Sequence, residues 1–81
     1  MQLTYDPRFN IAYLRLRAKT EQVETLHLSD EINIDIAPDG SVYGIELLNA
    51  NALLQADEGR LLLVNETSGE QREVPLSFET A

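Results

Sequence analysis

Residues 32–48 read INIDIAPDGSVYGIELL, and this stretch decides the fold. Apolar and polar residues alternate with a period of two on both sides of a Pro-Asp-Gly turn, and β-branched residues are frequent. The pattern predicts a β-hairpin with one apolar face and one polar face. Its polar face carries Asn33, Asp35 and Glu46, so the hairpin is also a place where chemistry can occur.

Shorter strand patterns precede this hairpin, and a helix and a second hairpin follow it. Asn49 can cap the helix and Gly59 can end it. We expect strands at residues 2–5, 11–17 and 23–28, a helix at 49–56, and hairpin strands at 60–66 and 71–78. The sequence therefore predicts an α+β, β-rich fold in a single domain over residues 1–81. Its architecture is an antiparallel β-meander of about five strands with one short helix and a C-terminal β-hairpin.

The chain is small and acidic. Its 81 residues carry 14 acidic and 6 basic side chains, for a formal net charge of −8. This balance argues against autonomous binding of nucleic acid, which needs cationic side chains on the phosphates. No apolar run approaches the ~20 residues that span a membrane, and the N-terminus lacks a signal-peptide pattern. We therefore expect a cytoplasmic protein that binds neither nucleic acid nor a membrane.

The composition leaves few ways to stabilise so short a chain. The absence of cysteine excludes disulfides and thiolate zinc sites, and a single histidine excludes a histidine-rich metal cage. No glycine-rich loop precedes a helix and no serine stands in a nucleophile-elbow pattern, so we expect no cofactor. Oligomerisation remains as a source of stability, and we predict a homo-oligomer, with a dimer favoured.

Matching the faces of successive strands gives an expected register. Ile36 should lie opposite Tyr43, and Ile32 opposite Leu47. Gly44 in mid-strand predicts a bulge or a close approach by Tyr13, Arg15 or another stretch of backbone. One apolar row should contain Leu14, Leu26, Ile34 and Ile45. On the polar face, one row should contain Tyr13, His27, Asn33 and Glu46, and a second row Arg15, Thr25, Asp35 and Gly44.

The polar rows support three interpretations. Tyr13, His27 and Glu46 are candidate catalytic residues, because a histidine near a carboxylate can transfer protons at neutral pH. Asp35 and Glu46 can instead hold a hard cation such as Mg²⁺ through oxygen ligands, although no metal-binding motif is present. The third interpretation is a solvated face or an oligomer contact, in which Arg15 pairs with Asp35 across Thr25. The candidate binding residues are Arg15, Asn33, Asp35 and Glu46.

The stretch Leu61-Leu62-Leu63-Val64 is the predicted interface. A continuous apolar run is typical of a strand that is covered on both faces. One short helix does not supply cover for both faces, so the second face is expected to meet another chain.

Most of the chain resembles a known family. The segments YDP (5–7), YLRL (13–16), INIDI (32–36) and GIELLNA (44–50), with Asn10 and Asp39-Gly40, resemble the bacterial domain-of-unknown-function family 2283 over residues 1–55. In this chain Asn10 and Asn49 stand where the family commonly has Asp. The resemblance implies a compact, β-rich, prokaryotic cytosolic protein with no established activity. It leaves residues 56–81 as a C-terminal extension.

The sequence predicts a non-enzymatic protein-interaction or self-associating module that uses the C-terminal hairpin and the sheet face. Two alternatives remain. The family resemblance implies an antitoxin-like role, because some members are encoded beside small ribonuclease-toxin-like proteins, and the acidic charge would suit a basic partner. The polar rows leave open an acid/base or metal site on the sheet face.

Overall fold

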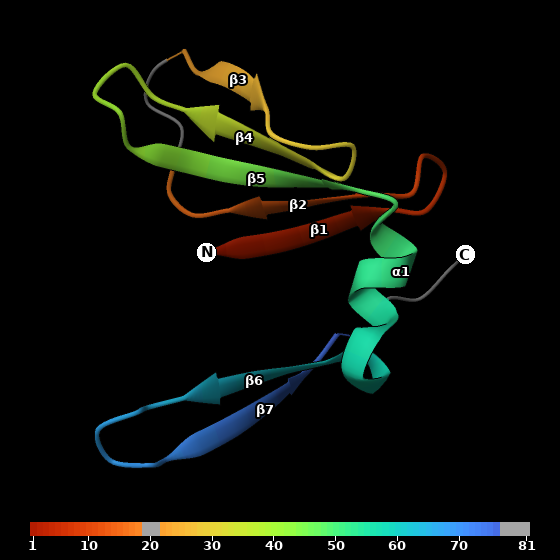
Figure 1. Ribbon diagram of the computed structural model, residues 1–81, viewed down its shortest axis with the longest axis vertical. Coiled ribbons are helices and arrows are strands. Elements are labelled where there is room, and N and C mark those ends of the chain that lie inside the picture. Colours follow the sequence, from red (N-terminus) through yellow and green to blue (C-terminus); the bar gives the residue numbers. More distant parts are fainter. Residues whose placement is uncertain (19–21, 77–81) are drawn as a thin grey trace.

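The computed structural model describes residues 1–18 and 22–76, apart from the side chains of residues 57 and 58. A five-stranded antiparallel sheet, one short α-helix and a two-stranded antiparallel hairpin confirm the predicted fold class (Figure 1). The elements are β1 (Gln2–Asp6), β2 (Ile11–Arg15), β3 (Glu24–His27), β4 (Ile32–Ile36), β5 (Val42–Leu48), α1 (Ala50–Gln55), a 3-10 helix (Ala56–Gly59), β6 (Arg60–Val64) and β7 (Gln71–Pro75). No helix within the described ranges is long and apolar enough to cross a membrane.

The order of the strands differs from a fully consecutive meander. The order is β1-β2-β5-β4-β3, so β2 pairs with β5, and β3 lies at the far edge. Leu14 of β2 lies opposite Ile45 of β5. This apolar pair joins the β1–β2 hairpin to the β4–β5 hairpin. All four residues of β3 are exposed, and such a short polar strand suits an edge better than the centre of a sheet.

The predicted register is confirmed except at one point. Ile32 lies opposite Leu47, and Ile34 lies opposite both Ile45 and Leu26. The predicted pairing of Ile36 with Tyr43 is wrong, because the register shifts after Asp35 and places Ile36 opposite Val42. Tyr43 is therefore an extra residue on β5, as in a β-bulge.

The start of α1 is capped by a distant residue. Asn49 precedes the helix with φ 56° and makes no side-chain cap bond, so the predicted capping by Asn49 is wrong. The N–H of Asn51 donates instead to Oδ1 of Asn10 at 2.8 Å, and the N–H of Ala50 donates to the Asn10 carbonyl at 3.0 Å. The β1–β2 turn therefore fixes the helix onto the sheet. Gly59, with φ 72°, ends the helical segment as predicted.

The best-buried apolar contacts are concentrated at one end of the sheet. Ala12 and Ala50 are fully buried and Leu54 is 8% exposed. Among the described residues, no large side chain is fully buried. Figure 1 shows α1 at one end of the five strands, with the β6–β7 hairpin beyond it. The side chains packed around this small core are Leu3, Tyr5, Leu47 and Leu76.

The Asn10 contacts give a first prediction. Asn10 has φ 55°, where alanine is strained and glycine is not. We expect Asn10→Ala to lower the free energy of unfolding by about 2 kcal/mol, through lost hydrogen bonds and backbone strain. Asn10→Gly loses the same side-chain bonds without that strain and should lower it by about 1 kcal/mol. Urea unfolding followed by circular dichroism measures both, and equal stability of both variants and the wild type would contradict the capping role.

Candidate functional site

The sheet aligns the predicted polar residues across its strands. Tyr13 of β2 lies opposite Glu46 of β5, which lies opposite Asn33 of β4, which lies opposite His27 of β3. The second predicted row is also present, in the spatial order Arg15, Gly44, Asp35 and Thr25. The membership of both rows is therefore as expected. The neighbours within each row differ, because β5 and not β3 lies next to β2.

One hydrogen-bonded chain joins β5, β4 and β3. Nδ2 of Asn33 donates to Oε1 of Glu46 at 2.9 Å, and Oδ1 of Asn33 lies 2.8 Å from Nδ1 of His27. Because the amide oxygen can only accept, Nδ1 of His27 carries the proton in this bond. The other ring nitrogen, Nε2, is then the acceptor of the neutral imidazole at the exposed edge of the sheet.

A second hydrogen-bonded group is centred on Asp35. The Tyr13 hydroxyl donates to Oδ2 of Asp35 at 2.6 Å, and Oγ1 of Thr25 donates to Oδ1 at 2.6 Å. Both carboxylate oxygens are thus engaged, by side chains that come from β2 and β3. Asp35 holds together strands that lie on either side of the β4–β5 pair.

Gly44 permits the Tyr13–Asp35 contact. It is buried in the middle of β5, and a Cβ at this position would lie 2.6 Å from Cε1 and Cζ of the Tyr13 ring. The Tyr13 side chain therefore crosses β5 over the one residue type that leaves room for it. This confirms the predicted close approach by Tyr13.

The surroundings of the Tyr13 hydroxyl strongly disfavour its ionisation. Burial, followed by the hydrogen bond to Asp35, raises the pKa of Tyr13 far above its ordinary value of 10.0. The protonated phenol is therefore the form that the folded protein favours at neutral pH. A tyrosine held in this way acts as a hydrogen-bond donor and is a poor general base.

Two other arrangements considered for the sheet face are an Arg15–Asp35 ion pair and a metal-binding cluster. Arg8–Asp6 and Arg60–Glu73 form ion pairs, whereas no ion pair joins the described side chains of Arg15 and Asp35, so the predicted pairing of these two residues is wrong. Gly44, and not Thr25, separates them in the row. In the described part of the chain, no group of three or more His, Cys, Asp or Glu side chains could hold a metal ion.

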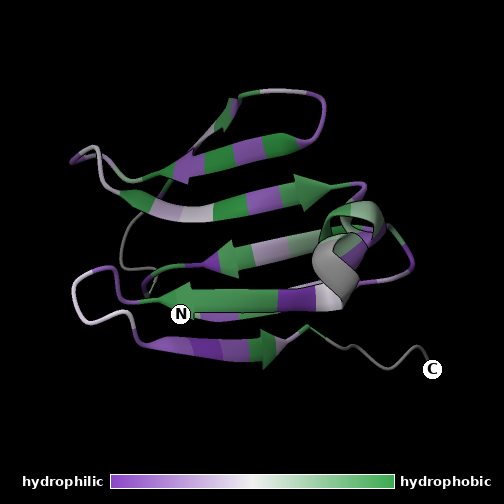
Figure 2. Ribbon diagram, turned by 60° about the horizontal axis from the view of Figure 1, so that its bottom comes forward, coloured by the Kyte–Doolittle hydropathy of each residue, from purple (hydrophilic) through white to green (hydrophobic). Residues whose placement is uncertain are grey.

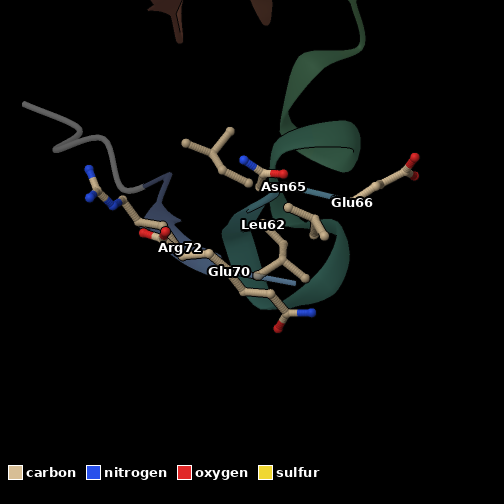
Figure 3. Close-up of a pocket in the computed structure, with 8 residues that line it drawn as sticks. Leu62, Asn65, Glu66, Glu70 and Arg72 are labelled. Atoms are coloured by element: carbon tan, nitrogen blue, oxygen red, sulfur yellow. The ribbon is translucent and has the colours of Figure 1, made fainter. Parts of the chain in front are cut away.

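The predicted interface residues lie on β6 and are half exposed. Leu61, Leu62, Leu63 and Val64 are 47%, 49%, 50% and 48% exposed, and these four residues occupy both faces of the strand. Figure 2 shows this hydrophobic strand beside a largely hydrophilic β7. A hollow runs along the hairpin, and Figure 3 shows Leu62 in it, between Glu66 on one side and Glu70 and Arg72 on the other.

Sequence reasoning missed the cluster around Asn10. Nδ2 of Asn10 donates to Oδ1 of Asn49 at 3.2 Å and to Oδ1 of Asn51 at 2.7 Å, and the Tyr5 hydroxyl donates to Oδ1 of Asn10 at 3.3 Å. Asn10 and Asn49 both have positive φ. This backbone conformation could have been predicted from the residue type, since asparagine tolerates it better than most residues do. Their proximity depends on the tertiary fold and has no local signature.

The Tyr13–Gly44 contact gives a second prediction. Gly44→Ala places a methyl group into the Tyr13 ring and should lower the free energy of unfolding by about 2 kcal/mol. In a Tyr13→Ala background the same substitution should cost much less, because the ring is gone. A double-mutant cycle measured by urea unfolding gives this coupling, and additive costs would contradict the contact.

The Tyr13 hydroxyl gives a third prediction, on pH dependence. Because its folded pKa is raised, the stability that it contributes is present below the unfolded pKa of about 10 and is lost as pH rises toward the folded value. The melting temperature of the wild type should therefore fall above pH 10 more steeply than that of Tyr13→Phe. Near neutral pH, Tyr13→Phe should be about 1 kcal/mol less stable than the wild type. Parallel pH profiles of the two proteins would contradict the shift.

A family model covers all five strands of the sheet and the start of α1. The model described as "Protein of unknown function (DUF2283)" matches residues 2–51, which include β1 to β5 and the Asn10 cluster. No significant match to a curated protein or to a solved structure was found. The matched segment is more than half of the chain and confirms the resemblance in the sequence. The chain therefore belongs to the DUF2283 family of proteins of unknown function.

Proposed function

We propose that this protein is a non-enzymatic interaction module that self-associates through its β6–β7 hairpin. The observation that carries the proposal is the half-exposed run Leu61 to Val64, which is apolar on both faces of β6. A second copy of the chain is the partner that would cover it.

The limited core supports this proposal. An 81-residue chain is near the lower end of sizes that fold alone. In the part of the chain that the structure describes, the apolar residues with no exposed surface are two alanines, Ala12 and Ala50. The chain has no cysteine and therefore no disulfide to compensate. Burial of apolar surface between two copies is a direct way to add stability to such a fold.

The form of the hairpin also supports it. A two-stranded hairpin is marginally stable in water unless more strands or another layer pack against it. In β6–β7 an apolar strand lies beside a strand rich in polar residues, and Arg60 and Glu73 form an ion pair at 3.1 Å across the two. An apolar centre with a polar rim is the usual anatomy of a protein interface.

The polar sheet face favours a structural role over catalysis. Asp35 uses both carboxylate oxygens on Tyr13 and Thr25, and Asn33 bridges Glu46 and His27. These side chains satisfy one another across the strands, as cross-strand pairs that stabilise a sheet do.

The net charge supports a second candidate, which is an interaction with a small basic protein. At −8 the chain attracts cationic surfaces, and this charge suits the antitoxin-like role that the family resemblance implies. Co-expression with a basic neighbour from the native genome, followed by size-exclusion chromatography in high salt, tests it. Co-elution that survives high salt would support a specific complex, because salt screens non-specific charge attraction. Separation of the two proteins would contradict it.

A fourth prediction tests self-association. Sedimentation velocity at micromolar concentration should show a dimer, and Leu63→Ser should weaken the dimer by about tenfold or more, because a symmetric interface loses the contact twice. Leu28→Ser is the matched control, since Leu28 is 63% exposed but lies outside the hairpin. Added salt should strengthen the wild-type dimer by screening two acidic chains. A wild-type monomer at all accessible concentrations would overturn the proposal.

A further inference from the structure

The free edge of β6 has the form of a strand that pairs with a copy of itself. We propose that β6 pairs edge to edge and antiparallel with β6 of a second copy, with a two-fold axis at Leu62. The product is a four-stranded layer in the order β7-β6-β6-β7. This inference rests on the proposed self-association and specifies its partner and its geometry.

The hydrogen bonds of the hairpin show which backbone groups point outward. The N–H of Asn65 donates to the carbonyl of Glu70 at 2.8 Å, and the N–H of Leu76 donates to the carbonyl of Gly59 at 2.6 Å. Hydrogen-bonded pairs alternate along an antiparallel ladder, so Leu61 and Leu63 also bond inward to β7. The N–H and C=O groups of the alternate residues then face away from β7. These outward residues include Leu62 and Val64.

The other edge of the hairpin is unsuited to pairing. The same alternation directs Gln71, Glu73 and Pro75 of β7 outward, and proline has no N–H to donate. A symmetric pairing of β7 strands about Glu73 would also place two glutamates opposite each other, which is destabilising. Of the two edges of the hairpin, the β6 edge therefore has outward N–H groups at Leu62 and Val64 and side chains that can lie opposite those of a second β6 without like-charge repulsion.

The charges along β6 are compatible with a two-fold axis at Leu62. In this register Leu62 lies opposite Leu62 of the second copy, and Arg60 lies opposite Val64, so no like charges meet along β6 itself. Residues 60–76 hold two arginines and three glutamates, a net charge of −1 against −8 for the whole chain. Pairing at the hairpin brings together surfaces that are less acidic than the chain as a whole.

The pairing also accounts for the two apolar faces of β6. A strand at the centre of a four-stranded layer is flanked on both edges, and its side chains then form a continuous apolar strip on each face with those of the second β6. Leu62 and Val64 belong to one strip, and Leu61 and Leu63 to the other. Both strips are the half-exposed surface described above.

A pair of proline variants tests the edge. Leu62→Pro removes an outward N–H of β6, and Glu73→Pro removes the outward N–H of the residue opposite it on β7. Neither substitution deletes a backbone hydrogen bond of the hairpin, so the two are matched in the strand ladder, although Glu73→Pro also removes the ion pair with Arg60. Sedimentation should show at least a tenfold weaker dimer for Leu62→Pro and an unchanged dimer for Glu73→Pro. Equal dimerisation of both variants and the wild type would overturn strand pairing and leave self-association standing.

A cysteine variant tests the axis in case Leu62→Pro fails to fold. The chain has no cysteine, so Leu62→Cys introduces a single thiol. Residues opposite each other in an antiparallel pair lie about 5.5 Å apart, within the range for a disulfide. Oxidation should cross-link Leu62→Cys into a dimer and leave Glu73→Cys monomeric on a denaturing gel. A dimeric wild type in which Leu62→Cys cross-links no faster than Glu73→Cys would refute this register, whereas a monomeric wild type would refute self-association itself.

Discussion

The chain is too short to bury all of its apolar side chains, and this constraint governs the whole molecule. The five-stranded sheet presents a full apolar face, but α1 is only six residues long and packs against one end of it. Ala12, Ala50 and Leu54 form the buried centre of that contact. The remaining apolar side chains of the sheet and the hairpin stay partly exposed, and the proposed self-association would cover part of this surface.

The polar face of the sheet shows how the strands keep their register. Tyr13 crosses β5 over Gly44 to reach Asp35 on β4, and Thr25 reaches the same carboxylate from β3. A shift by one residue would break these contacts and turn the apolar side chains toward solvent. The face that first suggested chemistry is thus a set of interlocking cross-strand bonds, and its residues lie in the segment matched by the family model.

The strands, the turns and the membership of both polar rows were predictable, because strand periodicity is a local property of the sequence. The strand order was not, since β2 can pair equally well by pattern with β3 or β5. The bulge at Tyr43 and the capping of α1 by Asn10 also escaped prediction. Both depend on contacts between residues that are distant in sequence. The role of Gly44 was predictable because a glycine in the middle of a strand typically marks a bulge or a close approach by another group.

Amide hydrogen exchange by NMR tests the central claim most directly. The amides of Leu61 and Leu63 bond within the hairpin, whereas those of Leu62 and Val64 face outward and exchange freely in a single copy. If β6 pairs with a second copy, Leu62 and Val64 become protected, and their protection rises with protein concentration. Rapid exchange at Leu62 and Val64 at every concentration, beside slow exchange at Leu61 and Leu63, would contradict the account.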